Sequence, residues 1–448
     1  MGKVHTLFRP DFPFAPEKWP FFYGWVIVAM GTLGTLASIP GQTAGVSPFK
    51  QPLLQALKLS DIQLSMAYMV GTLASGCIIP YCGQFCDRWG ARMTMVITLM
   101  AFSLSLLFMS SCQSIYTFAL NPWMPPWLVG TIVISLGFFL IRFWGQGMLI
   151  IVSRTMTSNW FDRKRGLVAA IGGIFTTIAF NSAPSILNQG VQHLGWQDTF
   201  FYLGILYFFG LTCFFWLFCR DTPEASDLQM DGTVLPEIEA DPNTFSEFKI
   251  YHEFTAEEAI KTWSFWLLTA TLGLHGFTIT AIFFHASDIA VGVGIGLDQF
   301  YSLLVPLAVI NVFAGFLLGW LNNKTRLKNI LIAYLVLQCL FPLSVLFLDN
   351  SLGQLAFIML GALSGACFGN LYNVACPRFF GRLHLGRING YVTSALVICS
   401  AVGPIFFSYI SQTTQSFQTA LWMCIGASAC LLPCAHKANN PQRLHTKF

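Results

Sequence analysis

Arg142 has the position that most strongly indicates chemistry in this sequence. It lies halfway along the mainly apolar stretch from Trp127 to Ser158, about 23 Å of helix from either end at ~1.5 Å per residue. An ionised side chain at that depth costs at least a few kcal/mol unless it faces water, a partner or a bound anion. Gln146 follows four residues later, on the same helix face. We expect this pair to bind a small anion, although Arg142 could instead be a hydrogen-bonding hub for helix carbonyls.

A second candidate site is a histidine and an aspartate three residues apart, His285 and Asp288, near one end of an apolar stretch that also contains His275. A neighbouring carboxylate raises the pKa of an imidazole toward physiological pH, so this pair could carry a proton. Equally, it could mark the polar boundary of the stretch. Neutral side chains that could line a cavity, or simply join helix to helix, are Gln42, Asn181, Asn311, Asn370, Tyr372 and Asn373.

These residues must be positioned by elements that lie in lipid. Hydrophobic residues make up 55% of the 448-residue chain and charged residues only 10%, whereas a soluble domain carries about 25% charge. Apolar stretches long enough to cross a bilayer recur along the chain, and such stretches form helices because backbone polar groups in lipid must pair internally. The sequence predicts an all-α polytopic membrane protein with twelve transmembrane helices, at residues 23–49, 62–84, 93–112, 127–158, 166–187, 200–219, 263–290, 299–321, 329–347, 353–375, 389–410 and 417–432.

The basic residues gather in alternate loops, which predicts that both termini are cytoplasmic. Residues 221–262 hold 11 of the 20 acidic residues and are expected to form a solvated linker. The expected organisation is an N-terminal six-helix bundle at 1–220, this acidic cytoplasmic linker, and a second six-helix bundle with a cytoplasmic tail at 263–448. Pro40-Gly41 and Pro306 are expected to break or bend the first and eighth spans.

The two halves repeat one another. The loop that begins at Gly83 aligns with the loop that begins at Gly319, at an offset of 236 residues. Trp160-Phe161 and Pro184 align with Phe379-Phe380 and Pro404, at an offset of 220. The repeats are therefore parallel, which favours a carrier whose halves move about a site near the middle of the membrane.

The first of these loops resembles the signature of the major facilitator superfamily, because Gly83, Asp87, Arg88, Gly90 and Arg92 occupy its defining positions. The resemblance implies a latch between the halves, in which Asp87 meets the start of the eleventh helix while Arg88 and Arg92 hold acidic or backbone groups. The second copy departs from the pattern, so no latch role is carried over to it.

Three shorter segments resemble the oxalate/formate antiporter and monocarboxylate transporter branch: Phe22-Tyr-Gly-Trp25, Val46-Ser-Pro-Phe49, and Trp160-Phe161 with Arg165-Gly166. That branch usually carries an arginine in the eighth helix, where this chain has only Pro306 and Asn311.

The resemblance implies a secondary transporter of a small organic anion, a monocarboxylate, working by proton symport or anion exchange. A carrier of a neutral or amphipathic compound and a non-transporting solute sensor are the alternatives. The expected partners are the solute, protons and the lipid bilayer; no nucleic acid, cofactor, metal or enzymatic reaction is expected. We expect a monomer in a bacterial inner membrane.

Overall fold

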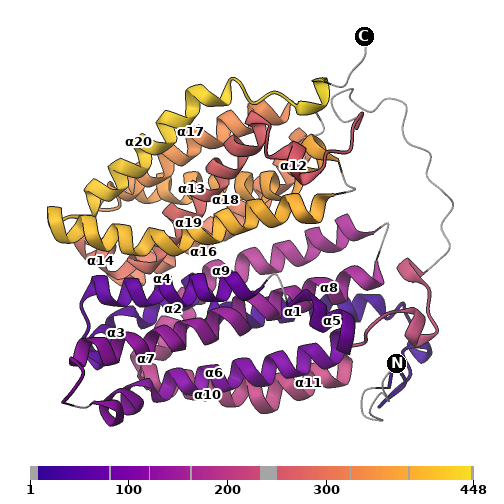
Figure 1. Cartoon of the computed structure of the whole chain (residues 1–448), viewed down its shortest axis with the longest axis horizontal. Helices are drawn as coiled ribbons and strands as arrows, with labels where there is room; N and C mark the ends of the chain where they lie inside the picture. Colours follow the sequence, from indigo (N-terminus) through magenta and orange to yellow (C-terminus); the bar gives the residue numbers. More distant parts are fainter. Residues whose placement is uncertain are drawn as a thin grey trace. The chain divides into compact units, whose positions relative to one another are not determined.

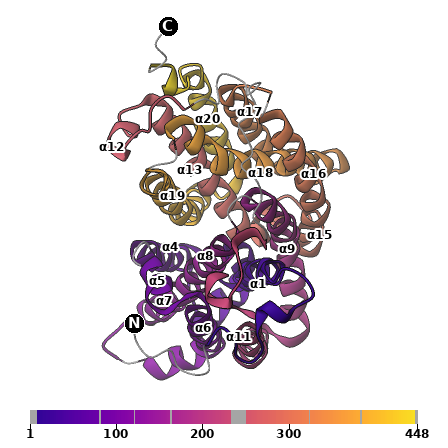
Figure 2. The same cartoon turned by 90° about the vertical axis from the view of Figure 1, so that its right-hand side faces the viewer.

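The computed structural model describes residues 9–79, 82–120, 122–161, 164–232, 250–322, 324–381 and 384–444. In these ranges the chain forms helices and turns and no strand. It divides into two compact units, Met1–Glu237 and Ile238–Phe448, each a bundle of long helices seen side-on in Figure 1 and nearly end-on in Figure 2. The expectation of an all-α fold is confirmed.

Across the described ranges, eleven helices are long and apolar enough to cross a membrane. The remaining expected span, at 62–84, corresponds to α4 (Asp61–Ile78), whose first turn contains Asp61 and Gln63 and lowers its apolar character. Together these helices make the twelve-helix architecture that the hydropathy pattern predicts.

In the N-terminal unit, α6 packs against α10 and α11, α4 against α7, and α1 against α8. These pairings bury apolar faces that carry almost no charge, so the helices are held mainly by side-chain packing. Besides α4 and three short 3-10 turns, the described helical segments of this unit are α1 (Gly24–Ala37), η3 (Ile39–Gly41), α2 (Thr43–Val46), η4 (Ser47–Phe49), α3 (Lys50–Leu57), α5 (Gly83–Trp89), α6 (Ala91–Ala119), α7 (Pro126–Ile141), η6 (Arg142–Leu149), α8 (Ile150–Trp160), α9 (Arg165–Leu194), α10 (Trp196–Ile205), η7 (Leu206–Leu211) and α11 (Thr212–Phe218).

The first span is broken rather than continuous. α1 ends at Ala37, and the single turn η3 contains Pro40 and Gly41. Gln42 is extended (φ −88°, ψ 158°), after which the chain continues as the short helices α2, η4 and α3. Pro40 has no backbone N–H and clashes with a continued α-helix. The expected break at Pro40-Gly41 is confirmed, so the predicted single helix at 23–49 is in fact several pieces.

The fourth span changes its winding at the candidate arginine. α7 ends at Ile141, the next eight residues form the π-helical segment η6, and α8 continues to Trp160. A π-helical turn holds one extra residue and is frequent at functional sites. Arg142 is the first residue of this segment.

In the C-terminal unit, α13 packs against α19, α18 against α16 and α17, and α17 against α20. The eighth span is interrupted between Ser302 and Leu304, close to Pro306 as expected. The helices are α12 (Ala256–Ala259), α13 (Trp263–Phe284), α14 (Ala286–Gly292), α15 (Leu297–Ser302), α16 (Leu304–Asn322), α17 (Leu327–Val345), α18 (Ser351–Phe380), α19 (Leu385–Thr414), α20 (Phe417–Ala435) and η11 (Pro441–Leu444).

Helix boundaries repeat at the offsets found in the sequence. α17 begins 236 residues after α6, at Leu327 and Ala91. α9 and α19 each have 30 residues, begin 220 residues apart, and carry Pro184 and Pro404 at corresponding positions. The parallel repeat therefore holds at the level of helix ends and internal prolines.

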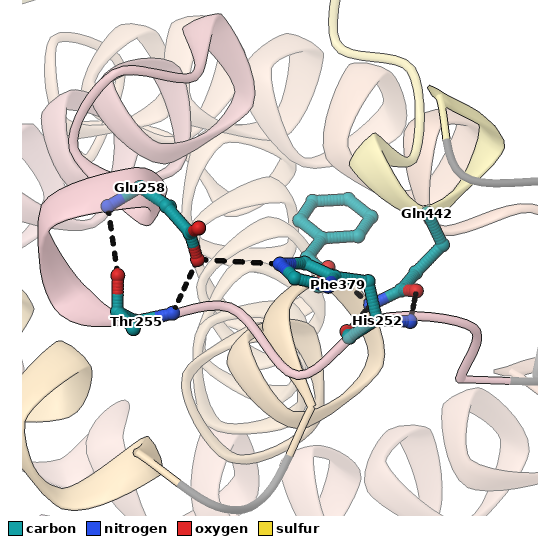
Figure 3. A network of polar contacts seen from close by, with 5 residues as sticks. All are labelled: His252, Thr255, Glu258, Phe379 and Gln442. Atoms are coloured by element: carbon teal, nitrogen blue, oxygen red, sulfur yellow. Dashed lines mark hydrogen bonds and ion pairs between the residues drawn. The ribbon is translucent and has the colours of Figure 1, made fainter.

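Both described ends of the acidic linker pack against their own units. In the first unit, Lys164 donates from its backbone N–H to Asp231 (3.2 Å). In the second, Gln442 accepts from the backbone N–H of Tyr251 (2.9 Å). It also accepts from the backbone N–H of His252 (2.9 Å), and its Nε2 donates to the carbonyls of His252 (2.8 Å) and Phe379 (3.1 Å) (Figure 3). One amide thus joins the second linker end, α18 and the C-terminal turn η11. Residues 233–249 lie outside the described part.

Candidate solute-binding site

Arg142 lies in a polar cluster built from three elements of the N-terminal unit. Its side chain is 2% exposed. Nη1 donates to the carbonyl of Gly41 (3.3 Å) and to Oγ1 of Thr43 (3.4 Å), both in the broken part of the first span. The guanidinium carbon lies 5.2 Å from the ring centroid of Tyr68 on α4, a cation–π contact. The helix break supplies these acceptors, because the carbonyl of Gly41 and the hydroxyl of Thr43 lie where the regular helical hydrogen-bond pattern is interrupted.

The charge of Arg142 is not neutralised by the protein around it. Both of its hydrogen bonds come from Nη1, and Nε has no partner. Within the described ranges no acidic side chain lies within ion-pair distance of it. The edge formed by Nε and Nη2 therefore keeps its donors for another group, and this edge has the fork geometry that matches a carboxylate.

Glycines allow the broken span to approach this arginine. A Cβ at Gly41 would lie 2.3 Å from the carbonyl oxygen of Ile141, and 3.1 Å from both the backbone nitrogen of Gln146 and the Cα of Gly145. No other residue type fits at Gly41 without moving the π-helical segment. The close approach places the carbonyl of Gly41 within reach of the guanidinium.

A hydroxyl pair completes the cluster. Oγ1 of Thr43 and the phenolic oxygen of Tyr68 lie 2.6 Å apart, and Tyr68 is fully buried against Phe138, ring centroids 5.4 Å apart. Either hydroxyl can be the donor in this pair, because Oγ1 of Thr43 can accept from Tyr68 as well as from Arg142.

Two of the other neutral candidates of this unit, Gln42 and Asn181, make local contacts. Gln146 is half-buried on η6, one turn beyond Arg142. Gln42 donates to Oγ of Ser38 (3.1 Å), and Asn181 donates to the carbonyl of Thr177 in its own helix (2.8 Å).

His285 and Asp288 lie together in the C-terminal unit, with Nδ1 of His285 3.5 Å from Oδ2 of Asp288. His285 is fully buried at the break between α13 and α14. Its Nε2 is 2.9 Å from the carbonyl of Pro404, and Oγ of Ser408 is 3.3 Å away. A carbonyl only accepts, so Nε2 carries a proton. The pair is thus a real contact that also ties α13 to α19 beside a helix-interior proline.

The remaining polar candidates of this unit do not form one cluster. Asn311 on α16 packs against Gly365, where a Cβ would lie 2.4 Å from its Nδ2. Tyr372 joins α18 to α19 through Oγ1 of Thr393 (2.9 Å). Asn373 is exposed and donates to the carbonyl of Gly369 (2.7 Å), while Asn370 is half-buried on α18.

The residues of the expected latch have different surroundings. Gly83 begins α5, Arg88 on the same helix is exposed, and the side chain of Asp87 lies outside the described part of the chain. Gly90 has φ +79° and precedes α6. Arg92 is 1% exposed and donates to the backbone carbonyls of Trp216 (Nε, 2.9 Å), Arg9 (Nη1, 3.0 Å) and Phe12 (Nη2, 3.0 Å). Arg92 therefore joins α6 to α11 and to the segment before the first span.

Asp221 is a residue of this region that sequence analysis missed. Its Oδ1 accepts from the backbone N–H of Arg92 (2.8 Å), so the carboxylate caps the N-terminus of α6. A Cβ at Gly90 would lie 2.6 Å from Asp221, which explains the glycine. Burial raises the pKa of the Asp221 carboxyl above its usual value, opposed by that hydrogen bond and by the charges of Arg92 and Arg220. No sequence signal marked it, because it follows α11 at the start of the acidic linker.

The comparisons with known proteins address the fold and the family. Residues 31–404 match the family described as Major Facilitator Superfamily. A solved structure of a D-xylose-proton symporter is similar, with a TM-score of 0.66 and 16% identity over 95% of this chain and 100% of the other. A bacterial homolog of the human lysosomal transporter Spinster, inward-facing and unoccupied, has a TM-score of 0.62 and 13% identity over 94% and 96% of the two chains. No curated protein matches the sequence.

A helical membrane bundle with an internal parallel repeat and a buried, unneutralised arginine defines a class of protein, the membrane transporters. The family match covers most of the chain, and the chain belongs to the major facilitator superfamily. It is a transporter, not an enzyme, and it spans the membrane many times.

Proposed function

We propose that this transporter moves a small organic anion, a monocarboxylate, across the membrane by alternating access. The observation that carries the proposal is the free Nε–Nη2 edge of Arg142, a buried cation without an acidic partner among the described residues. A carboxylate would form two parallel charge-assisted hydrogen bonds with this edge.

The charge of the solute would also compensate for burying the arginine. A cation in an apolar bundle is costly, and an anion that binds next to it removes most of that cost. Binding therefore changes the electrostatic balance of the N-terminal unit, which favours a conformational response to the solute. We propose further that the protein is a monomer in a bacterial inner membrane and that both of its termini are cytoplasmic.

His285 and Asp288 are proposed as the proton-carrying pair. Nε2 already carries the proton that it donates to Pro404. Nδ1 faces a carboxylate oxygen 3.5 Å away, so two acceptors face each other unless one of them binds a proton. Proton uptake would turn this repulsion into an ion pair or a hydrogen bond. The pair thus supports proton symport. Anion exchange, the other proposed mode of transport, would not require a proton-carrying pair.

A neutral or amphipathic solute is the second candidate. It is favoured by the abundance of phenylalanine and tryptophan, with 43 and 13 residues, which could line a cavity without charge recognition. The free edge of Arg142 argues against it, because a neutral solute would leave the cation uncompensated. A solute sensor that does not transport is the candidate from another class.

The deciding experiment is uptake into proteoliposomes that contain the purified protein. Labelled monocarboxylates, their neutral methyl esters and a sugar are tested with and without an inward pH gradient. We expect uptake of at least one monocarboxylate, no uptake of its ester, and acceleration by the gradient if protons are co-transported. Preference for the ester would refute the anion proposal, and an absence of flux together with saturable binding would show a sensor.

A further inference from the structure

The C-terminal unit contains a small cavity between three helices, separate from His285 and Asp288. α13 contributes His275, Thr278 and Ile279, α17 contributes Gln338 and Pro342, and α18 contributes Ser364. The ring of His275 stacks on Phe368 with centroids 4.3 Å apart. The cavity volume is about 10 Å³, close to the minimum for one water molecule.

Two buried polar atoms of this cavity, Oε1 of Gln338 and Oγ of Ser364, have no partner at hydrogen-bond geometry, although the Tyr334 hydroxyl lies near the Gln338 side chain. Gln338 is 5% exposed and Ser364 1%. The amide of Gln338 is fixed in place, because its Nε2 donates to the carbonyl of Thr271 on α13 (2.9 Å). Its Oε1 is therefore held as an acceptor, and such an atom is costly to bury without a donor.

Pro342 adds an acceptor at the same place. It lies inside α17, four residues after Gln338, and has no N–H to donate to the backbone carbonyl of Gln338. The backbone carbonyl of Gln338 thus lacks its usual helical donor, beside the side-chain oxygen that has no partner. Ser364 can donate or accept.

We infer that this cavity binds an uncharged hydroxyl group, which donates to Gln338 and pairs with Ser364. The lining contains no acidic residue, lysine or arginine, so it does not suit an ionised ligand. A space of this size holds a single water molecule, so the hydroxyl is that of a bound water. This inference does not depend on the anion proposed for Arg142, since the cavity lies within the C-terminal unit.

The test compares Ser364→Ala with a matched control, Thr269→Val. Thr269 is on α13 in the same unit, is 6% exposed, has an unpartnered Oγ1, and does not line the cavity. If the cavity is occupied, Ser364→Ala removes a real hydrogen bond and lowers the Tm of the full-length protein in detergent by about 1–2 °C. Thr269→Val removes a hydroxyl that pairs with nothing and leaves the Tm unchanged or higher.

An experimental density map should show a water peak within about 3.2 Å of both Oε1 of Gln338 and Oγ of Ser364. Ethylene glycol is too large for the cavity and should not raise the Tm of the wild type; a saturable rise that is absent in Ser364→Ala would overturn the assignment to water. A Ser364→Ala protein as stable as Thr269→Val, with no density in the wild-type cavity, overturns the inference.

Discussion

Replacement of Arg142 tests the proposed function most directly. Its free edge can make two charge-assisted hydrogen bonds to a carboxylate, each with a net contribution of about 1.5–3 kcal/mol. Arg142→Gln loses both bonds and the charge, and at ~1.4 kcal/mol per decade this is a loss of at least about 100-fold in transport efficiency. Arg142→Lys keeps the charge but loses the fork, so we expect KM for the solute to rise about 10–100-fold with a smaller change in maximal rate.

The assay is initial uptake of the labelled anion over a range of concentrations in proteoliposomes. Arg154→Gln is the matched control, because Arg154 lies in the same span on α8 but is exposed. Arg142→Gln should not unfold the protein, since it replaces a buried unpaired cation and so removes a desolvation cost, and Arg154→Gln changes only an exposed side chain. An Arg142→Gln protein that keeps more than about a tenth of wild-type uptake would refute anion binding by this residue.

Three further predictions concern the elements around the sites. Gly41→Ala should abolish transport or lower the protein yield, because its Cβ would lie 2.3 Å from a carbonyl oxygen of α7; Gly173→Ala, where the Cβ meets nothing within 4 Å, should transport normally. Asp221→Ala should lower the Tm, and because burial raises the pKa of Asp221, the folded state holds its proton more tightly and this contribution falls as pH rises. The Tm difference from the wild type should therefore shrink as the pH rises above about 4, the usual aspartate range, with exposed Glu224→Ala as the control; a difference that grows with pH contradicts the assignment. His285→Gln should abolish uptake driven by a pH gradient while solute exchange remains, and gradient-driven uptake at the wild-type rate would exclude His285 as the proton carrier.

Much of the fold was predictable because lipid imposes a simple rule on sequence. Apolar stretches longer than a bilayer must be helical, so the helices followed from composition alone. The repeat was predictable too, since Pro184 and Pro404 keep their places in helices of equal length. Pro40-Gly41 marked the break in the first span because proline cannot continue a helix.

The parts that sequence analysis missed depend on contacts between distant residues. The π-helical segment that begins at Arg142 changes the winding without a proline to mark it. Asp221 caps α6 from a position 129 residues further along the chain. Asn373 was grouped with possible cavity residues by its polarity, yet it is exposed and bonds within its own helix. Polarity in an apolar helix indicates that a residue needs a partner, and only the folded chain shows which partner it finds.

The contacts of Gln442 matter for how this protein is best tagged and purified. A fluorescent-protein fusion placed after residue 444 leaves the side-chain amide of Gln442 in contact with Tyr251, His252 and Phe379. A fusion placed directly after Ala435, where the last long helix ends, would discard these bonds and leave two backbone N–H groups without their acceptor. Trimming the C-terminal tail back to the last transmembrane helix would therefore disturb the linker segment around Tyr251 and His252, which precedes the first long helix of the same unit.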